Sequence, residues 1–182
     1  MKEEEKTISK VVIGSDHAGL ACKEKILQFL LSKGFDSIED VGTFTESSVD
    51  YPDIAHQLCK VMIANTEEYS NTKGILICGT GIGVSIAANK VIPSNATAES
   101  LGLSASNVFR ASLCWNTYTA EMTRKHNNSN ILCMGARTTS VEEMKEIVNV
   151  FLNTSFDGGR HDTRLAKLGG IISSESMGQD IL

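Results

Sequence analysis

The sequence predicts an α/β protein: a doubly wound, Rossmann-like three-layer sandwich with a five-stranded parallel sheet. Short apolar runs alternate five times with stretches of helical periodicity. Polar or glycine-rich residues follow several of these runs, at the strand ends where open parallel sheets place ligand groups. The 182 residues, 41% hydrophobic and 21% charged, fit one domain with a substantial core. Right-handed crossovers are expected between the strands.

The charge and composition indicate a small-molecule partner. The formal net charge of -5, with no run of basic residues, argues against a nucleic-acid surface. No apolar stretch approaches the roughly 20 residues needed to span a bilayer. The acidic opening at residues 1–6 also differs from a secretory or organellar leader. We therefore expect a cytoplasmic protein with no membrane or nucleic-acid partner.

The cysteines and histidines give no sign of a disulfide framework or a metal site. The five cysteines are odd in number, widely spaced and mostly inside apolar runs, which favours reduced thiols. The four histidines include no pair at helical metal-ligand spacing, and no acidic calcium-binding loop is present. The sequence therefore predicts no metal. The residues concerned are Cys22, Cys59, Cys78, Cys114 and Cys133, and His17, His56, His126 and His161.

The first strand and helix follow a flexible N-terminal tail, expected at residues 1–9. A strand at 11–13 leads into a helix with an apolar face, which Gly34 ends. Asp16 and His17 therefore fall at the carboxyl end of a strand, where open α/β sheets bind ligands. A helix N-cap explains Asp16 equally well.

The second β-α unit contains a candidate pocket residue. A short strand at 37–42 and a polar loop at 43–50 precede Pro52, which suits the first turn of a helix. Apolar residues recur at helical intervals after this proline. Tyr51 can line a pocket or pack on the helix, and both alternatives remain open.

A glycine-rich segment at residues 74–90 is the most informative part of the chain. An apolar run breaks into three alternating glycines and resumes as a helical pattern, which predicts a strand, a tight turn and a helix. Free amides at the start of such a helix can hold an anion or a developing oxyanion. The spacing of Gly79, Gly81 and Gly83 fits neither the dinucleotide fingerprint nor a P-loop. The loop also lacks the arginine that a cysteine-dependent phosphatase requires.

Cys78 stands at the rim of this turn. A thiol beside a helix N-terminus ionises more easily, and its thiolate can act as a base or a nucleophile. Free cysteine is also among the most buried residue types, so a structural role is the alternative.

The second half of the chain predicts the last two strands. Residues 91–109 are rich in Ser, Asn and Ala, and we expect them to form an inserted surface excursion. Strands at 110–114 and 131–135 flank a helix capped by Asn116 or Thr117.

The last long helix begins with a capping box at Ser140. Residues 10–168 are expected to form a single domain. Residues 169–182 are expected to be a C-terminal tail.

Three arginines in the C-terminal part are candidate anion ligands. Arg137 follows the fifth strand and so lies at a ligand-binding strand end. Arg160 and Arg164 are four residues apart, and on a helix their guanidinium groups could clamp one phosphate. The alternative is an ordinary solvated basic face.

Six motifs in order, from about residue 10 to 168, together resemble ribose-5-phosphate isomerase type B. They are Gly-Ser-Asp-His-Ala-Gly at 14–19, Asp-Tyr-Pro at 50–52, the glycine-rich segment at 74–83, Ala-Ala-Asn-Lys at 87–90, Arg-Lys-His-Asn at 124–127 and Gly-Gly-Arg-His at 158–161. The resemblance implies an aldose–ketose isomerase of the non-oxidative pentose phosphate pathway. Such an enzyme interconverts ribose 5-phosphate and ribulose 5-phosphate through a cis-enediolate, without a cofactor.

The resemblance also implies a role for each candidate residue. Cys78 is similar to the family's base, and the loop amides with the Thr80 hydroxyl could stabilise the oxyanion. His126 matches the proton donor that opens the furanose ring. The substrate contacts implied by the resemblance are Asp16, His17, Tyr51, Gly79, Gly81, Ile82, Gly83, Asn127, Arg137, Arg160 and Arg164, with His17 and the three arginines as the phosphate clamp.

The family typically forms homodimers or homotetramers, and the resemblance implies an active site shared between subunits. The segment from Lys90 to Cys114 departs from the family pattern, because it is longer by about fifteen residues. Trp115 stands where many relatives have a polar residue, and it could narrow the pocket.

Two alternative functions remain open. Allose 6-phosphate or galactose 6-phosphate isomerase has the same chemistry, and pocket depth would decide between the sugars. A sugar-phosphate sensor without turnover would keep the anion site and lose the base or acid, whereas both Cys78 and His126 are present.

Overall fold

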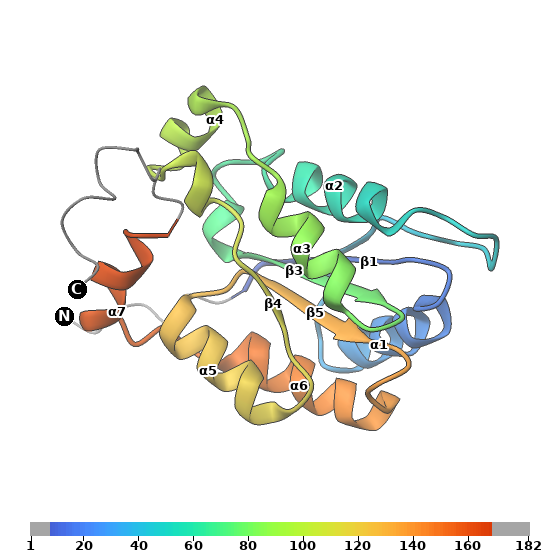
Figure 1. Ribbon diagram of the computed structural model, residues 1–182. Helices are drawn as coiled ribbons and strands as arrows, with labels where there is room; N and C mark the ends of the chain where they lie inside the picture. The colour runs from blue at the N-terminus through green and yellow to red at the C-terminus, as the bar shows by residue number, and fades with distance from the viewer. Residues whose placement is uncertain (1–7, 169–182) are drawn as a thin grey trace, which may run out of the picture.

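The computed structural model describes residues 8–168 and contains a five-stranded parallel sheet in the order β2-β1-β3-β5-β4 (Figure 1). The predicted parallel α/β sheet is therefore confirmed. Of the two predicted tails, residues 1–7 and 169–182 lie outside the described residues. The strands are β1 (Lys10–Ser15), β2 (Ile38–Asp40), β3 (Thr72–Cys78), β4 (Ala111–Leu113) and β5 (Ile131–Gly135).

Strand β3 forms the centre of the sheet. All seven of its residues are buried, because helices cover both faces of a doubly wound sheet. It pairs with β1 on one side and with β5 on the other. The register places Ser15 opposite Ile77 and Gly135 opposite Cys78, so the three central strands end at the same edge.

The helices form two layers, one on each face of the sheet (Figure 1). On one face, α2 and α3 pack with residues such as Leu58 and Val84 in one apolar core. On the other, α1, α5 and α6 form a second core that includes Leu30 and Phe151. The helices are α1 (Leu20–Ser32), α2 (Tyr51–Met62), α3 (Ile82–Lys90), α4 (Asn95–Ser100), α5 (Thr117–Asn127), α6 (Val141–Asn153) and α7 (Arg160–Leu165), with short 3-10 helices η1 (Tyr69–Asn71) and η2 (Ala105–Asn107). None of the helices in the described part is long and apolar enough to cross a membrane.

Side-chain caps fix where the helices around the site begin. The amide of Thr119 donates to the Asn116 side chain at 2.8 Å, so Asn116 rather than Thr117 is the N-cap of α5. The predicted capping box at Ser140 is present: its amide donates to the Glu143 carboxylate at 2.9 Å and its hydroxyl accepts from the Glu143 amide at 3.3 Å.

Residues 91–109, expected as a surface excursion, contain α4 and η2. Ala98, Val108 and Phe109 from this segment are buried in the core on the α2 and α3 side. The Tyr69 hydroxyl also donates to the carbonyl of Val108. The segment is thus anchored in the core both at Ala98 and at its C-terminal end.

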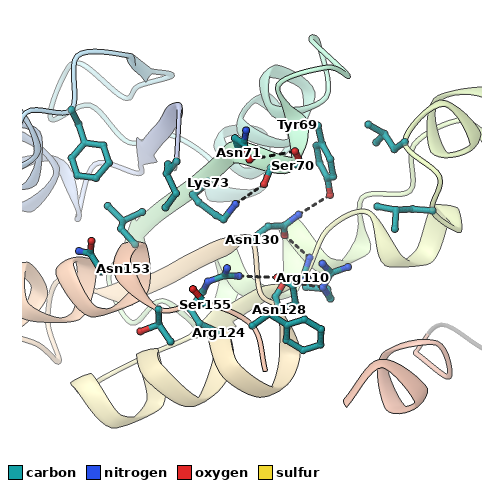
Figure 2. Close-up of a pocket in the computed structure, with 17 residues that line it drawn as sticks. Tyr69, Ser70, Asn71, Lys73, Arg110, Arg124, Asn128, Asn130, Asn153 and Ser155 are labelled. Carbon is teal, nitrogen blue, oxygen red and sulfur yellow. Dashed lines mark hydrogen bonds between the residues drawn. The ribbon is translucent and has the colours of Figure 1, made fainter. Parts of the chain in front are cut away.

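A cavity of about 680 Å³ lies at the amino end of the sheet (Figure 2). Asn130 lies just before β5 and lines this cavity. Its side chain donates to the Tyr69 hydroxyl and to the Val108 carbonyl, both at 2.7 Å. It also accepts from the amide of Arg110 at 2.8 Å. These bonds tie the start of β5 to the segment before β4.

Candidate active site

The turn after β3 holds the Cys78 thiol against the start of α3. Cys78 is the last residue of β3 and is 5% exposed. Its sulfur accepts the amide N–H of Gly81 at 3.1 Å. Gly81 has φ +78°, and a Cβ there would lie 2.5 Å from Leu113, so the turn requires glycine for both reasons. The sulfur is therefore fixed against a backbone donor just before the N-terminus of α3.

Thr80 and Tyr51 line the same turn. Thr80 is exposed, and its hydroxyl accepts the amide of Ile82 at 3.4 Å. A Cβ on Gly83 would lie 2.7 Å from the Tyr51 ring, so the aromatic ring packs against the turn. Tyr51 also keeps 41% of its surface exposed, so it packs against the turn and still has a free surface that can line a pocket.

Arg137 covers the other side of the turn. Its amide donates to the Gly79 carbonyl at 2.9 Å, as an extension of the β3–β5 pairing. A Cβ on Gly79 would lie 3.5 Å from the Arg137 guanidinium. A cation is thus held beside the thiol-bearing loop.

Asp16 and His17 lie next to this loop, because β1 pairs with β3. The Asp16 amide donates to the carbonyl of Ile77 at 3.2 Å. Its carboxylate accepts the amide of Gly19 at 3.1 Å, although Gly19 is the N-cap residue of α1. His17 Nδ1 accepts the amide of Val49 at 3.3 Å, which leaves Nε2 to carry the proton when the ring is neutral. Asp16, His17, Tyr51, Cys78 to Gly83 and Arg137 form what we name the loop cluster.

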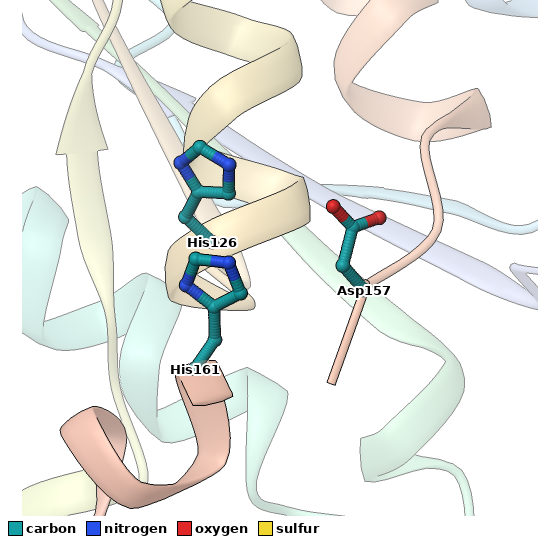
Figure 3. A group of neighbouring side chains, drawn as sticks. All are labelled: His126, Asp157 and His161. Carbon is teal, nitrogen blue, oxygen red and sulfur yellow. The ribbon is translucent and has the colours of Figure 1, made fainter. Parts of the chain in front are cut away.

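A second group of predicted site residues lies at the C-terminal end of α5 (Figure 3). The rings of His126 and His161 stack with centroids 4.4 Å apart and an interplanar angle of 11°. Burial lowers the pKa of His161, and the neighbouring His126, Arg160 and Arg164 lower it further. A cavity of about 270 Å³ is lined by His126, Asn127, His161, Arg164, Leu165 and Leu168. We name His126, Asn127, Arg160, His161 and Arg164 the helix-end cluster.

Asp157 joins the two histidines in a group that the sequence spacing did not reveal. Ligand atoms of His126, Asp157 and His161 lie within 4.8 Å of one another, and imidazole nitrogen and carboxylate oxygen are zinc ligands. The three residues come from α5, the α6–α7 connection and α7, as Figure 3 illustrates. Sequence spacing within one helix could not have identified a group assembled from three segments.

The two clusters lie at opposite ends of the sheet. Helix α5 follows β4 and runs back, so that it ends at Asn127, shortly before β5 begins at Ile131. The five residues of β5 span roughly 15 Å at about 3.3 Å per residue. Figure 1 shows α7 and the end of α5 on the side away from the tips of β3 and β5. Within one chain, the structure thus brings Cys78 together with Asp16 and Arg137 but not with His126.

The sequence model of the Ribose/Galactose Isomerase family matches residues 11–168. The chain belongs to this family. The predicted resemblance to ribose-5-phosphate isomerase type B is confirmed, since the chain is 34% identical over 164 residues to the Escherichia coli protein named ribose-5-phosphate isomerase B. That match covers 90% of this chain and 97% of the relative.

Two solved structures of family members resemble the fold closely. Ribose 5-phosphate isomerase from Thermotoga maritima is 42% identical with a TM-score of 0.73, covering 87% of this chain and 95% of that one. Ribose-5-phosphate isomerase B from Mycoplasma genitalium, solved with bound ribulose-5-phosphate, is 36% identical with a TM-score of 0.73. That match covers 87% of this chain and 92% of that one.

Proposed function

We propose that the protein is an isomerase that interconverts ribose 5-phosphate and ribulose 5-phosphate through a cis-enediolate, without a cofactor. The observation that carries the proposal is the position of Cys78. Its sulfur accepts the Gly81 amide just before α3, and its two chain neighbours, Ile77 and Gly79, accept the backbone amides of Asp16 and Arg137. The Escherichia coli relative named for this reaction and the Mycoplasma genitalium structure with ribulose-5-phosphate support the choice of sugar.

Cys78 is the proposed base. Its thiolate removes the proton from C2 of the open-chain aldose, and the electron pair moves to the carbonyl oxygen on C1. The resulting enediolate oxygen is stabilised by amides of the 79–83 turn and by the Thr80 hydroxyl. Return of the proton from sulfur to C1, with transfer of the O2 proton to O1, gives the ketose and restores the thiolate.

The phosphate binds remotely from the reacting carbons. His17 and Arg137 from the loop cluster, with Arg160 and Arg164 from the helix-end cluster, form the proposed clamp. Binding energy from the phosphate fixes the sugar chain for proton transfer. Asp16 holds the sugar hydroxyls, Asn127 adds a further contact, and His126 donates the proton that opens the furanose ring.

The proposed active unit is a homodimer, or a homotetramer built from such dimers, whose sites form between chains. Cys78 and His126 lie at opposite ends of the sheet, so within a single chain the loop cluster and the helix-end cluster cannot form one site. Ile82, which belongs to the loop cluster, and Ile86 stand four residues apart on α3. They are 53% and 51% exposed and give an apolar surface that extends from the cluster along the helix. A two-fold axis that joins the loop cluster of one chain to the helix-end cluster of the other creates two equal sites.

We also propose a cytoplasmic location, because the five cysteines are unpaired and the mechanism needs a reduced Cys78.

The test is conversion of ribose 5-phosphate by the purified full chain, without added metal or cofactor, beside allose 6-phosphate and galactose 6-phosphate. We expect pentose turnover that Cys78→Ala abolishes and that Cys22→Ala, at a partly exposed cysteine on α1, leaves intact. Turnover of a hexose alone would reassign the substrate. An active Cys78→Ala protein would refute the proposed base, and binding of every sugar without turnover would indicate a sensor.

A further inference from the structure

The cavity at the amino end of the sheet is separate from the residues of the proposed active site. Its volume of about 680 Å³ lies in the range of small-molecule sites. None of its lining residues belongs to the loop cluster or the helix-end cluster. Phe35 and Leu152 contribute an apolar wall on the side of the α1 and α6 core. Arg110 and Arg124 contribute a cationic one (Figure 2).

The two arginines are held by neutral acceptors. Arg124 is 7% exposed, and its Nη1 donates to the Asn128 side chain at 3.1 Å. Its Nε is buried and has no acceptor in the described part of the chain. Arg110 Nε donates to the carbonyls of Asn127 and Asn128 at 3.1 and 3.0 Å. The geometry of both guanidinium groups is thus fixed without a carboxylate.

The positive charge of this wall is uncompensated among the described residues. No Asp or Glu occurs among the described residues that line the cavity. Burial lowers the pKa of Arg124 to about 10, with a further contribution from the nearby Arg110, whose own pKa burial also lowers. Buried cations are costly unless an anion accompanies them, so the cavity favours a negatively charged occupant.

We propose that this cavity binds a phosphorylated small molecule, with its phosphate on Arg110 and Arg124 and its organic part against the apolar wall. Guanidinium groups bind phosphate through paired N–H donors, and the buried Nε of Arg124 is one such donor. A phosphate ion alone would fill a small part of about 680 Å³, and the apolar wall suits an organic group. This inference does not depend on the proposed isomerase activity.

The chain itself contains a second source of the same anionic chemistry. Glu3, Glu4 and Glu5 precede Ile8, which lines the cavity, and they lie outside the described residues. The experiment therefore includes a full-length variant in which all three are glutamine.

The test is isothermal titration calorimetry of the full chain with adenosine 5′-monophosphate and with inorganic phosphate. Ser155 is an exposed residue at the cavity, and Ser155→Glu places a carboxylate there without disturbing the core. We expect this variant to weaken binding of the monophosphate at least tenfold. The matched control Asn149→Glu adds the same charge on the exposed surface of α6, outside the cavity lining, and should bind like the parent.

Two further variants separate this site from the substrate clamp and from loss of folding. Arg124→Gln should also lose binding, and thermal unfolding reports whether it remains folded. Arg137→Gln, at the proposed clamp, should keep adenosine 5′-monophosphate binding while it raises the KM for sugar phosphate. Failure of the isomerase assay would therefore leave this result unaffected.

Three outcomes would overturn the proposal. The first is absence of binding of both probes in the parent and in the triple glutamine variant. The second is binding only in the triple glutamine variant, which would identify the chain's own carboxylates as the occupant. The third is binding that Arg137→Gln abolishes and Ser155→Glu leaves unchanged, which would place the probes in the substrate site.

Discussion

Mixing two inactive variants tests the shared site directly. Cys78→Ala removes the proposed base from the loop cluster, and His126→Ala removes the proposed acid from the helix-end cluster, at the other end of the sheet. Each variant alone should be inactive. When the two chains are co-expressed in equal amounts and pair at random, half of the sites receive their loop cluster from a His126→Ala chain, where it is intact. Independently, half of the sites receive their helix-end cluster from a Cys78→Ala chain, where that cluster is intact. The mixture should therefore recover about 25% of the parent activity in an interchain site.

A matched pair distinguishes complementation from other sources of activity. Cys78→Ala and Arg137→Ala both change the loop cluster of one chain, so no mixed site has an intact cluster. That mixture should show no activity beyond the residual activity of its Arg137→Ala chains. The assay is the initial rate of ribulose 5-phosphate formation, normalised to total chain. Full co-expression of the Cys78→Ala and His126→Ala chains without recovery, together with a dimer in solution, would refute the interchain arrangement.

Three further predictions concern stability. Gly81→Ala should lower the free energy of unfolding by about 2–5 kcal/mol, because φ at this position is positive and the new Cβ would lie 2.5 Å from a methyl group of Leu113. Gly34→Ala is the control: φ is also positive, at +83°, but nothing lies within 4 Å of the new Cβ, so the loss should be about 1–2 kcal/mol. Equal losses of unfolding free energy for the two variants, measured by urea unfolding, would contradict the predicted clash with Leu113. Asp40→Asn should cost about 3 kcal/mol, because it strips the counter-charge from Lys23, whose ammonium lies 2.7 Å from both carboxylate oxygens and is 1% exposed. Lys23→Met in the same chain should recover part of that loss, and no recovery would contradict the pairing. The pKa of His161 is lowered in the folded chain, so the unfolded chain binds more protons and the free energy of unfolding should rise with pH below about 6.5. His161→Gln should flatten that rise, measured as the urea midpoint of unfolding at each pH.

The sequence predicts most of the loop cluster because its members follow apolar strands. Parallel strands end at one edge, so Asp16, Cys78 and Arg137 had to converge once the alternation of strands and helices was recognised. The reasons why Gly81 and Gly83 must be glycine could not be predicted from the sequence. They depend on contacts with Leu113 and Tyr51, which come from distant parts of the chain.

The remaining features depend on tertiary contacts that leave no local pattern. Val108 and Phe109 end a polar segment, and only packing against the core under α2 and α3 buries them. The group of His126, Asp157 and His161 is assembled from three segments. The arginines of the amino-end cavity also gave no signal, because they are fourteen positions apart, with Arg110 just before β4 and Arg124 on α5.

The separation of the proposed base and the proposed acid follows from the topology of the fold. In a parallel sheet every crossover helix runs against the strands, so a helix begins at the strands' carboxyl edge and ends at the opposite edge. Cys78 ends β3 just before α3 begins, and His126 lies in the last turn of α5. The residue proposed to accept a proton and the residue proposed to donate one therefore lie at opposite edges. In the proposed dimer, a second chain that presents its α5 end to the first chain's loop would join the two without altering either helix.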